Sequence, residues 1–327
     1  MSALREAAAS YLALRRALGF GLVRDGKLLT QFIDYLEAQQ ASTVTVDAAI
    51  AWVRQPAQAS PGWLGFRMRV VRSFAIWLSG RDTTCEIPPP NVLAGQPRRA
   101  VPYLYSPDEI RDLMDATSTL RKPLRQATYR TLIGLLAVTG MRIGEAITLD
   151  DTDLDTETGV LTVRAGKGSG VRLLPLQPST TSALVAYQQH RDALLPRRNS
   201  ALLVSPPNGS RLIYCNVANT FRLLTQRAGL TPRSTACRPR IHDLRHSFAV
   251  ATLTDWYADG GDIPSRLPLL STWLGHIHPK GTYWYLTGSP ELLALVGKRL
   301  ENLCGNGDRH DCSRTDAASV FHSTAGR

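Results

Sequence analysis

The most informative stretch of the sequence reads HDLRHSFA at positions 242–249. His242 and Arg245 lie three residues apart, and on a helix this spacing places both side chains on one face. A second stretch, TYWYL, contains Tyr285 nine residues after His276. A tyrosine phenol attacks phosphorus when its oxygen loses a proton and cationic groups hold the phosphate oxygens. The two stretches together predict a site that attacks phosphate.

The overall charge indicates a nucleic-acid partner. The chain has 327 residues, with 38 Lys and Arg against 27 Asp and Glu, and a formal charge of +11. Such a surface attracts anionic polymers by displacing their counterions. We therefore expect double-stranded DNA as the partner. A chain of this length is also expected to form two domains, each with its own core.

Membrane and secreted classes fit the sequence poorly. It has no run of about 18 apolar residues, and its start, MSALRE, lacks the apolar core of a secretory signal. The five cysteines are scattered and form no Cys-x-x-Cys pair, which argues against a disulfide framework and a zinc ribbon. We expect a cytoplasmic protein with reduced thiols.

The first 82 residues are expected to form a helical DNA-binding domain. Apolar spacing predicts helices at 4–18 and 26–39, and two more after Thr45 and Pro61. In the fourth helix, apolar residues would meet a core and arginines would meet a phosphate backbone. The apolar positions are Leu64, Met68, Val71, Ala75 and Leu78, and the arginines are Arg67, Arg69 and Arg72. An ordinary solvated basic face is the alternative.

Residues 83–103 read as a basic, proline-rich linker, with Arg98 and Arg99 as further candidate DNA contacts. The sequence SPDE at 106–109 then gives a serine cap, a proline at the first helical position and acid in the first turn. We expect the second domain to span 104–302. Residues 303–327 are expected to form a flexible tail, whose Cys and His spacing fits no common zinc pattern.

The second domain mixes helices with one small sheet. Two strands, at 161–164 and 171–176, are predicted on either side of GKGSG at 166–170, which makes a hairpin with a glycine-rich tip. Helices are predicted at 129–139, 145–149, 179–195, 215–228, 242–257 and 267–274. The expected fold class is mainly α with a small β-sheet (α+β).

The order of the charged residues resembles the tyrosine recombinase, or phage-integrase-like, family. Its signature is an Arg, a hairpin Lys, a His-x-x-Arg, a second His or Trp, and a nucleophilic Tyr. The matching residues are Arg142, Lys167, His242, Arg245, His276 and Tyr285. The neighbouring sequence TGMRIGE at 139–145 also looks like the first family box. The resemblance covers about residues 103–300 and implies a catalytic domain, preceded by a region similar in size and helicity to a SAM-like core-binding domain.

The resemblance implies a role for each position. Arg142 and Arg245 would hold two non-bridging phosphate oxygens with their planar donors. Lys167 would protonate the departing 5'-oxygen, and Glu145 would support the site without touching substrate. His242 would accept the Tyr285 proton or donate a hydrogen bond to the phosphate, and His276 would add another donor; the sequence leaves this division of roles open. Neither a metal nor another cofactor is expected, because arginines supply the positive charge.

The implied activity is site-specific recombination of DNA through a covalent 3'-phosphotyrosyl intermediate, for integration, excision or transposition of a mobile element. Two sites and four protomers would take part, with accessory recombinases or DNA-bending proteins as further partners. Type IB topoisomerase-like relaxation and a catalytically silent DNA-binding accessory role are the alternatives. Tyr283 is the alternative nucleophile, because it flanks Trp284 on the other side from Tyr285.

Overall fold

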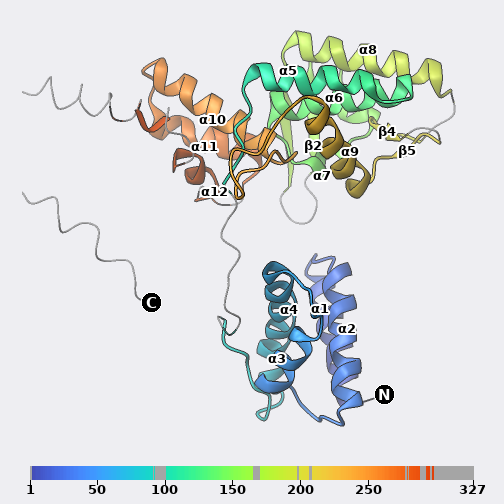
Figure 1. Cartoon of the computed structure of the whole chain (residues 1–327), viewed down its shortest axis with the longest axis vertical. Coiled ribbons are helices and arrows are strands. Elements are labelled where there is room, and N and C mark those ends of the chain that lie inside the picture. Colours follow the sequence, from blue (N-terminus) through green and yellow to red (C-terminus); the bar gives the residue numbers. More distant parts are fainter. Residues whose placement is uncertain are drawn as a thin grey trace, which may run out of the picture. The chain divides into compact units, whose positions relative to one another are not determined.

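The computed structural model describes residues 2–90, 92, 101–164, 170–196, 199–205, 208–276, 278, 280–287, 292–294 and 297. The chain divides into two compact units, Met1–Arg245 and His246–Arg327. Helices dominate the described parts of both units, and short antiparallel strands form two small sheets in the first (Figure 1). This architecture confirms the expected fold class, mainly α with a small β-sheet.

The first part of the chain forms four helices, as predicted: α1 (Ala3–Ala17), α2 (Val23–Ala38), α3 (Val46–Arg54) and α4 (Pro61–Ser79). Side-chain oxygens of Ser2, Thr45 and Ser60 accept hydrogen bonds from the first turns of α1, α3 and α4. These bonds satisfy amide donors that a helix leaves unpaired at its start. The four helices share one aromatic and aliphatic core, in which the rings of Phe32 and Trp52 lie 5.1 Å apart.

Arg67 does not lie on the surface of α4. Only 7% of it is exposed, its Nη2 donates to the Trp52 carbonyl at 2.7 Å, and its guanidinium lies 3.6 Å from the Trp52 ring centre. Burial lowers its pKa. The reason is helical spacing, because Arg67 shares a face with the fully buried Val71 and Phe74, four and seven positions on. This corrects the expectation that Arg67 contacts DNA.

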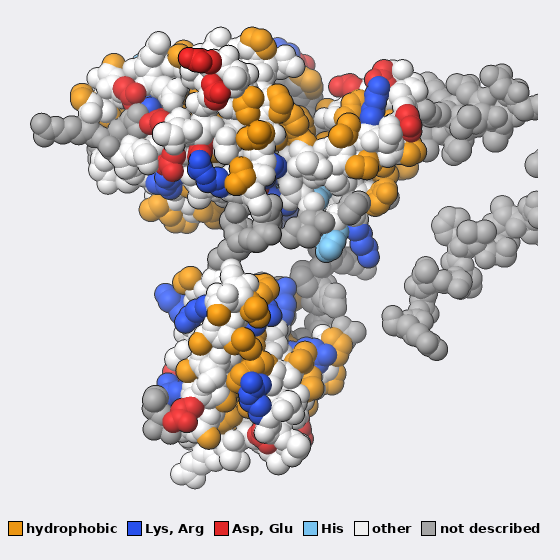
Figure 2. Space-filling view, turned by 180° about the vertical axis from the view of Figure 1, so that it is seen from behind, with side chains coloured by type: hydrophobic (Ala, Val, Ile, Leu, Met, Phe, Trp, Pro, Cys, Tyr) orange, Lys and Arg blue, Asp and Glu red, His pale blue; other side chains and the backbone are white. Residues whose placement is uncertain are grey.

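The other two arginines of α4 differ from Arg67. Arg69 is exposed, and Arg72 is partly buried and donates to the Pro88 carbonyl. Figure 2 shows Lys and Arg side chains at several places on the visible face of these N-terminal helices. Arg69 therefore stays a candidate for a backbone contact, and Arg98 and Arg99 lie outside the described residues.

Helix α5 (Pro107–Asp115) begins as predicted. The Ser106 side chain accepts from the Glu109 amide at 3.1 Å, and the Glu109 carboxylate accepts from the Ser106 amide at 2.8 Å. The chain continues through η1 (Ala116–Thr119), α6 (Pro123–Thr139), α7 (Ile143–Thr148) and η2 (Asp151–Asp153). Gly140 ends α6 in a left-handed conformation, with φ of 61°, which suits a residue without a Cβ.

The predicted hairpin is present as an antiparallel sheet of β1 (Leu154–Asp155), β2 (Val160–Arg164) and β3 (Val171–Pro175). Its register pairs Leu161 with Leu174 and Arg164 with Val171. Both leucines are fully buried, so the sheet turns one face to the core. Lys167, expected at the tip, lies outside the described residues.

In the described part of the remaining chain, loops connect further helices and a second sheet of two short strands. The order is α8 (Pro178–Leu194), β4 (Val204–Ser205), β5 (Ser210–Arg211), α9 (Tyr214–Arg227), α10 (Asp243–Ala258), α11 (Ile263–Leu274), α12 (Lys280–Tyr283) and η3 (Trp284–Thr287). Helix α6 packs on α5 and α8 (Figure 1). Within the described ranges, no helix combines the length and the apolar character needed to cross a bilayer.

Candidate active site

The turn between α6 and α7 holds the first arginine of the predicted signature. Arg142 directly precedes α7, and its amide nitrogen and its Nη1 donate to the Glu145 carboxylate at 2.8 and 2.9 Å. The Glu145 side chain is buried, whereas 40% of the Arg142 side chain is exposed. Glu145 therefore fixes the arginine from the inner side, while part of Arg142 remains in contact with solvent.

Arg172 of β3 is a second partner of Glu145 and was not among the residues predicted from the sequence. Its Nη1 and Nη2 donate to the two carboxylate oxygens at 3.0 and 2.6 Å, and its side chain is only 9% exposed. Burial alone would raise the pKa of Glu145, but hydrogen bonds from Arg172 and from the Arg142 backbone lower it overall. A charged residue inside the otherwise apolar strand VRLLP is the signal that could have revealed Arg172.

The second arginine of the signature is tied to the same turn. Arg245 lies in the first turn of α10, is 2% exposed, and donates from Nη1 to the Gly140 carbonyl at 2.8 Å. Arg142 follows Gly140 by two residues. The turn that contains Arg142 therefore also accepts the hydrogen bond from Arg245. These contacts lie within the first unit and bring two residues together that are about a hundred positions apart in the sequence.

His242 precedes α10, and its carbonyl accepts from the Arg245 amide at 3.2 Å. Its side chain keeps contact with solvent, yet the protein around the ring desolvates it. Desolvation and then the positive charges of Arg245 and Arg142 move the pKa of His242 below its ordinary value of 6.5. The neutral imidazole is thus the favoured form beside the two arginines.

In the second unit, Tyr285 lies against two imidazole rings. It is 4% exposed, with its ring centre 5.2 Å from that of His246 and 6.0 Å from that of His276, which it stacks nearly parallel at 17°. Tyr283, the alternative nucleophile, is 53% exposed. His246 was not among the predicted site residues, although it stands one position after Arg245.

Thr282 and Gly281 position His276. The Thr282 hydroxyl lies 2.8 Å from His276 Nδ1 and is also hydrogen-bonded to Ser271. At Gly281, a Cβ would lie 3.2 Å from the His276 ring, so a side chain here would require the ring to shift by a few tenths of an ångström. Neither residue was predicted from the sequence, where the available signal was a glycine and a threonine directly before Tyr283.

Among the described residues, no three His, Cys, Asp or Glu side chains lie close enough together to hold a metal ion. The Cys and His residues of the tail lie outside the described residues. Arg142, Arg172 and Arg245 supply positive charge near the turn at 140–145.

Comparisons with known proteins place this chain in a family. Residues 104–288 match the sequence profile of the phage integrase family. The chain belongs to this family, the tyrosine recombinases. Over 307 residues it is 39% identical to y4rB of Sinorhizobium fredii, whose name assigns it to the integrases and recombinases; the match covers 92% of this chain and 98% of y4rB. It is also 30% identical over 218 residues to a tyrosine recombinase XerD of Oceanobacillus iheyensis, covering 66% of this chain and 67% of XerD.

Solved structures share the fold. The Tn1549 transposon integrase in complex with transposon right-end DNA aligns with a TM-score of 0.65 at 18% identity, over 93% of this chain and all of that one. The XerH site-specific recombinase bound to its difH substrate aligns with a TM-score of 0.59 at 18% identity, over 88% of this chain and 79% of that one.

Proposed function

We propose that this protein is a site-specific DNA recombinase that cleaves and rejoins DNA strands through a covalent 3'-phosphotyrosyl intermediate. The observation that carries the proposal is the position of Tyr285 against the rings of His246 and His276, in a chain that belongs to the phage integrase family. The names of its relatives, integrase and recombinase, support the same reading.

In the proposed reaction, the Tyr285 oxygen forms a bond to the scissile phosphorus as the bond from phosphorus to the 5'-oxygen breaks. The Tyr285 proton passes to a base, and the departing 5'-oxygen takes a proton from Lys167. Arg142 and Arg245 hold the non-bridging oxygens, on which negative charge builds in the transition state. The 5'-hydroxyl of a partner strand then reverses these steps and releases the tyrosine.

His242 is the proposed base. Because its pKa lies below the ordinary value, its ring is neutral near pH 7 and ready to accept a proton. His276 is proposed to donate a hydrogen bond to the phosphate, since Thr282 already engages Nδ1 and thereby sets the tautomer presented at Nε2. Glu145 acts through Arg142 and does not touch substrate.

We propose duplex DNA as the partner, and four protomers acting on two synapsed sites, because each tyrosine breaks one strand. Accessory recombinases or DNA-bending proteins belong to the same proposal. A role in a mobile element is supported by the Tn1549 transposon integrase, whose fold this chain shares, and y4rB is named as an integrase or recombinase. We retain the division into a DNA-binding domain at 1–82, a linker at 83–103 and a catalytic domain at 104–302.

The nucleophile is tested with suicide substrates. The protein is incubated, without metal, with nicked duplexes from the ends of the element that carries its gene, and denaturation-resistant protein–DNA adducts are measured. Tyr285→Phe and Tyr283→Phe each remove one hydroxyl and serve as a matched pair. We expect an adduct with the wild type and with Tyr283→Phe, and DNA binding without an adduct for Tyr285→Phe.

Two outcomes would contradict the proposal. Binding of these duplexes by the wild type with no adduct on any of them would favour the silent accessory role. Relaxation of supercoiled plasmids with and without the site at the same rate, and no exchange between two sites, would favour topoisomerase-like activity.

A further inference from the structure

Two tyrosines just ahead of α5, Tyr103 and Tyr105, are buried against the segment that leads into α10. Only 3% of Tyr103 and 6% of Tyr105 is exposed, and their rings lie 4.9 Å apart. The Tyr105 hydroxyl donates to the main-chain carbonyl of Arg240 at 3.1 Å, across 135 positions of sequence. Arg240 stands two positions before His242, so this contact reaches the edge of the candidate active site.

The Arg240 carbonyl closes the turn in which His242 lies. It also accepts from the Asp243 amide at 2.9 Å, so residues 240–243 form a four-residue turn with His242 at its third position. The Arg240 side chain bonds the same residue, because Nε and Nη2 donate to the two Asp243 carboxylate oxygens at 2.9 and 2.7 Å. Asp243 is fully buried. His242 is therefore held in a turn whose two ends are joined through both main chain and side chain.

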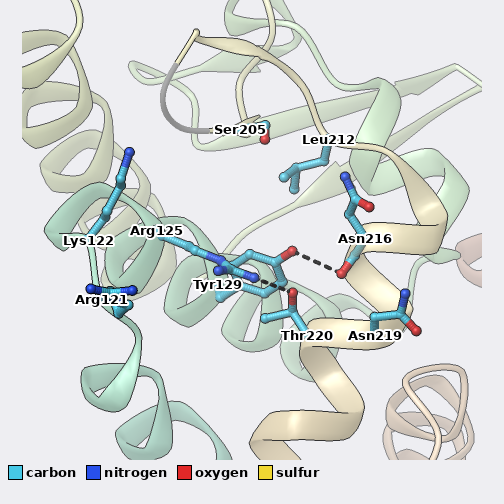
Figure 3. Close-up of a pocket in the computed structure, with 9 residues that line it drawn as sticks. All are labelled: Arg121, Lys122, Arg125, Tyr129, Ser205, Leu212, Asn216, Asn219 and Thr220. Carbon is cyan, nitrogen blue, oxygen red and sulfur yellow. Dashed lines mark hydrogen bonds between the residues drawn. The ribbon is translucent and has the colours of Figure 1, made fainter.

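Helix α9 seats the Tyr105 ring. The ring stands edge-on to that of Phe221, with the ring centres 6.4 Å apart at 89°. Next to Phe221, the Thr220 hydroxyl accepts from Arg125 of α6 at 2.8 Å, so α9 is bonded to α6 at this point (Figure 3). Helix α6 ends at the turn that carries the first arginine of the signature. The Tyr105 hydroxyl thus projects from a ring that is fixed by the packing of α9.

Tyr105 remains a hydrogen-bond donor at any working pH. Burial and then the Asp243 carboxylate raise its pKa above the ordinary value, so the phenol keeps its proton. The group that titrates here is His242, whose pKa is lowered first of all by desolvation. The charged groups that act on it are Arg245, Asp243, Arg240 and Arg142. A change in the depth of the His242 ring should therefore be visible in its titration.

We propose that Tyr105 is a positioning residue for the recombination reaction, whose hydroxyl fixes the turn at 240–243 and thereby the place of the His242 ring. The inference rests on the proposed function and deepens it, because His242 is the proposed base. Proton transfer needs the base within hydrogen-bond reach of its donor, and a small displacement is costly in rate. Tyr105 is buried, so its effect falls on the reaction step and not on DNA affinity.

Tyr103 provides a matched control. Its hydroxyl donates to the Glu109 carboxylate in α5 and not to the turn at 240–243. Tyr103→Phe and Tyr105→Phe each remove one buried hydroxyl and keep the ring. A purely structural role predicts similar consequences for the two variants, whereas a positioning role predicts that Tyr105→Phe alone alters His242.

An NMR titration of the His242 ring in the full-length protein, without DNA, is the first test. Loss of the Tyr105 hydroxyl frees the turn and lets water reach the ring, which relieves the desolvation that lowers the pKa. We expect the midpoint in Tyr105→Phe to move up toward 6.5 and that in Tyr103→Phe to stay at the wild-type value. An unchanged midpoint in Tyr105→Phe, or an equal shift in both variants, would overturn the proposal.

The rate of adduct formation on the suicide substrates is the second test. At saturating DNA we expect Tyr105→Phe to be slower by roughly tenfold and Tyr103→Phe to stay within about twofold of the wild type, as for one lost hydrogen bond to the turn. DNA affinity should be the same in all three proteins. Equal rates for the two variants would count against a positioning role.

The double variant Tyr105→Phe/His242→Gln shows whether Tyr105 acts through His242. If it does, Tyr105→Phe should slow the reaction no further once the imidazole is gone. A second fall of the same size in the His242→Gln background would overturn the proposal. If the wild type forms no adduct, the proposed function fails, whereas the His242 midpoint still decides whether Tyr105 holds the turn.

Discussion

At the scale of single residues, Thr282 links the candidate nucleophile to the rest of the second unit. It is 1% exposed, and its one hydroxyl contacts both His276 Nδ1 and Ser271. His276 in turn stacks on Tyr285. Thr282 is therefore a positioning residue, which acts on the reaction through His276.

Thr282→Val removes this hydroxyl and keeps the branched shape. We expect the rate of adduct formation to fall by about tenfold, equivalent to roughly 1.4 kcal/mol for one lost buried hydrogen bond. DNA affinity should not change. Thr282→Ser restores the hydroxyl and should recover most of the rate, whereas equally slow Val and Ser variants would show that the methyl group and its packing matter instead.

His242 makes the protein sensitive to pH in a defined direction. The pKa of His242 is lower in the folded protein than its ordinary value of 6.5. At a pH between the folded-state pKa and 6.5, the unfolded chain therefore binds more protons than the folded protein. The free energy of unfolding should therefore rise with pH through this window and fall as the medium becomes more acidic. An NMR titration should give a midpoint below 6.5 for His242, and His242→Gln should flatten the dependence of stability on pH. A midpoint at or above 6.5 would contradict the assignment.

At the scale of elements, one buried carboxylate joins α7 to β3. Glu145 accepts from Arg142 in the turn before α7 and from both terminal nitrogens of Arg172 in β3. Because Arg245 contacts Gly140 in the same turn, the hairpin, α7 and the start of α10 meet at a few polar contacts. The position of the arginines therefore depends on the packing of the sheet.

Arg172→Leu leaves Glu145 buried with fewer partners. We expect it to lower the free energy of unfolding by about 3 kcal/mol, because removing one member of a buried pair strands the other charge. Arg111→Leu, at an exposed pair with Asp108, should cost less than about 1 kcal/mol. Denaturant unfolding measures both, and Arg172→Leu/Glu145→Leu should recover part of the loss. Equal effects at the two arginines would show that burial adds nothing to the Glu145 pair.

At the scale of the whole molecule, local sequence patterns predicted most of the helices. Capping residues and apolar spacing predicted the positions of helices α1 to α5 to within a few residues. These signals are local, because they act between residues at most four positions apart. The hairpin was predicted for the same reason, since its strands alternate and are close in sequence. The ordered signature residues and the TGMRIGE stretch predicted the family, which the match over residues 104–288 confirms.

The sequence by itself determined the fold class, the family and the chemical types available for attack on phosphate. Only the tertiary structure decided where three side chains lie: Arg67 inside the helical core, Arg172 on Glu145, and Tyr285 rather than Tyr283 against two imidazole rings. The physical reason is range. Propensity and spacing act over one or two helical turns, whereas the burial of a charge or a phenol depends on residues that packing brings together from tens of positions away.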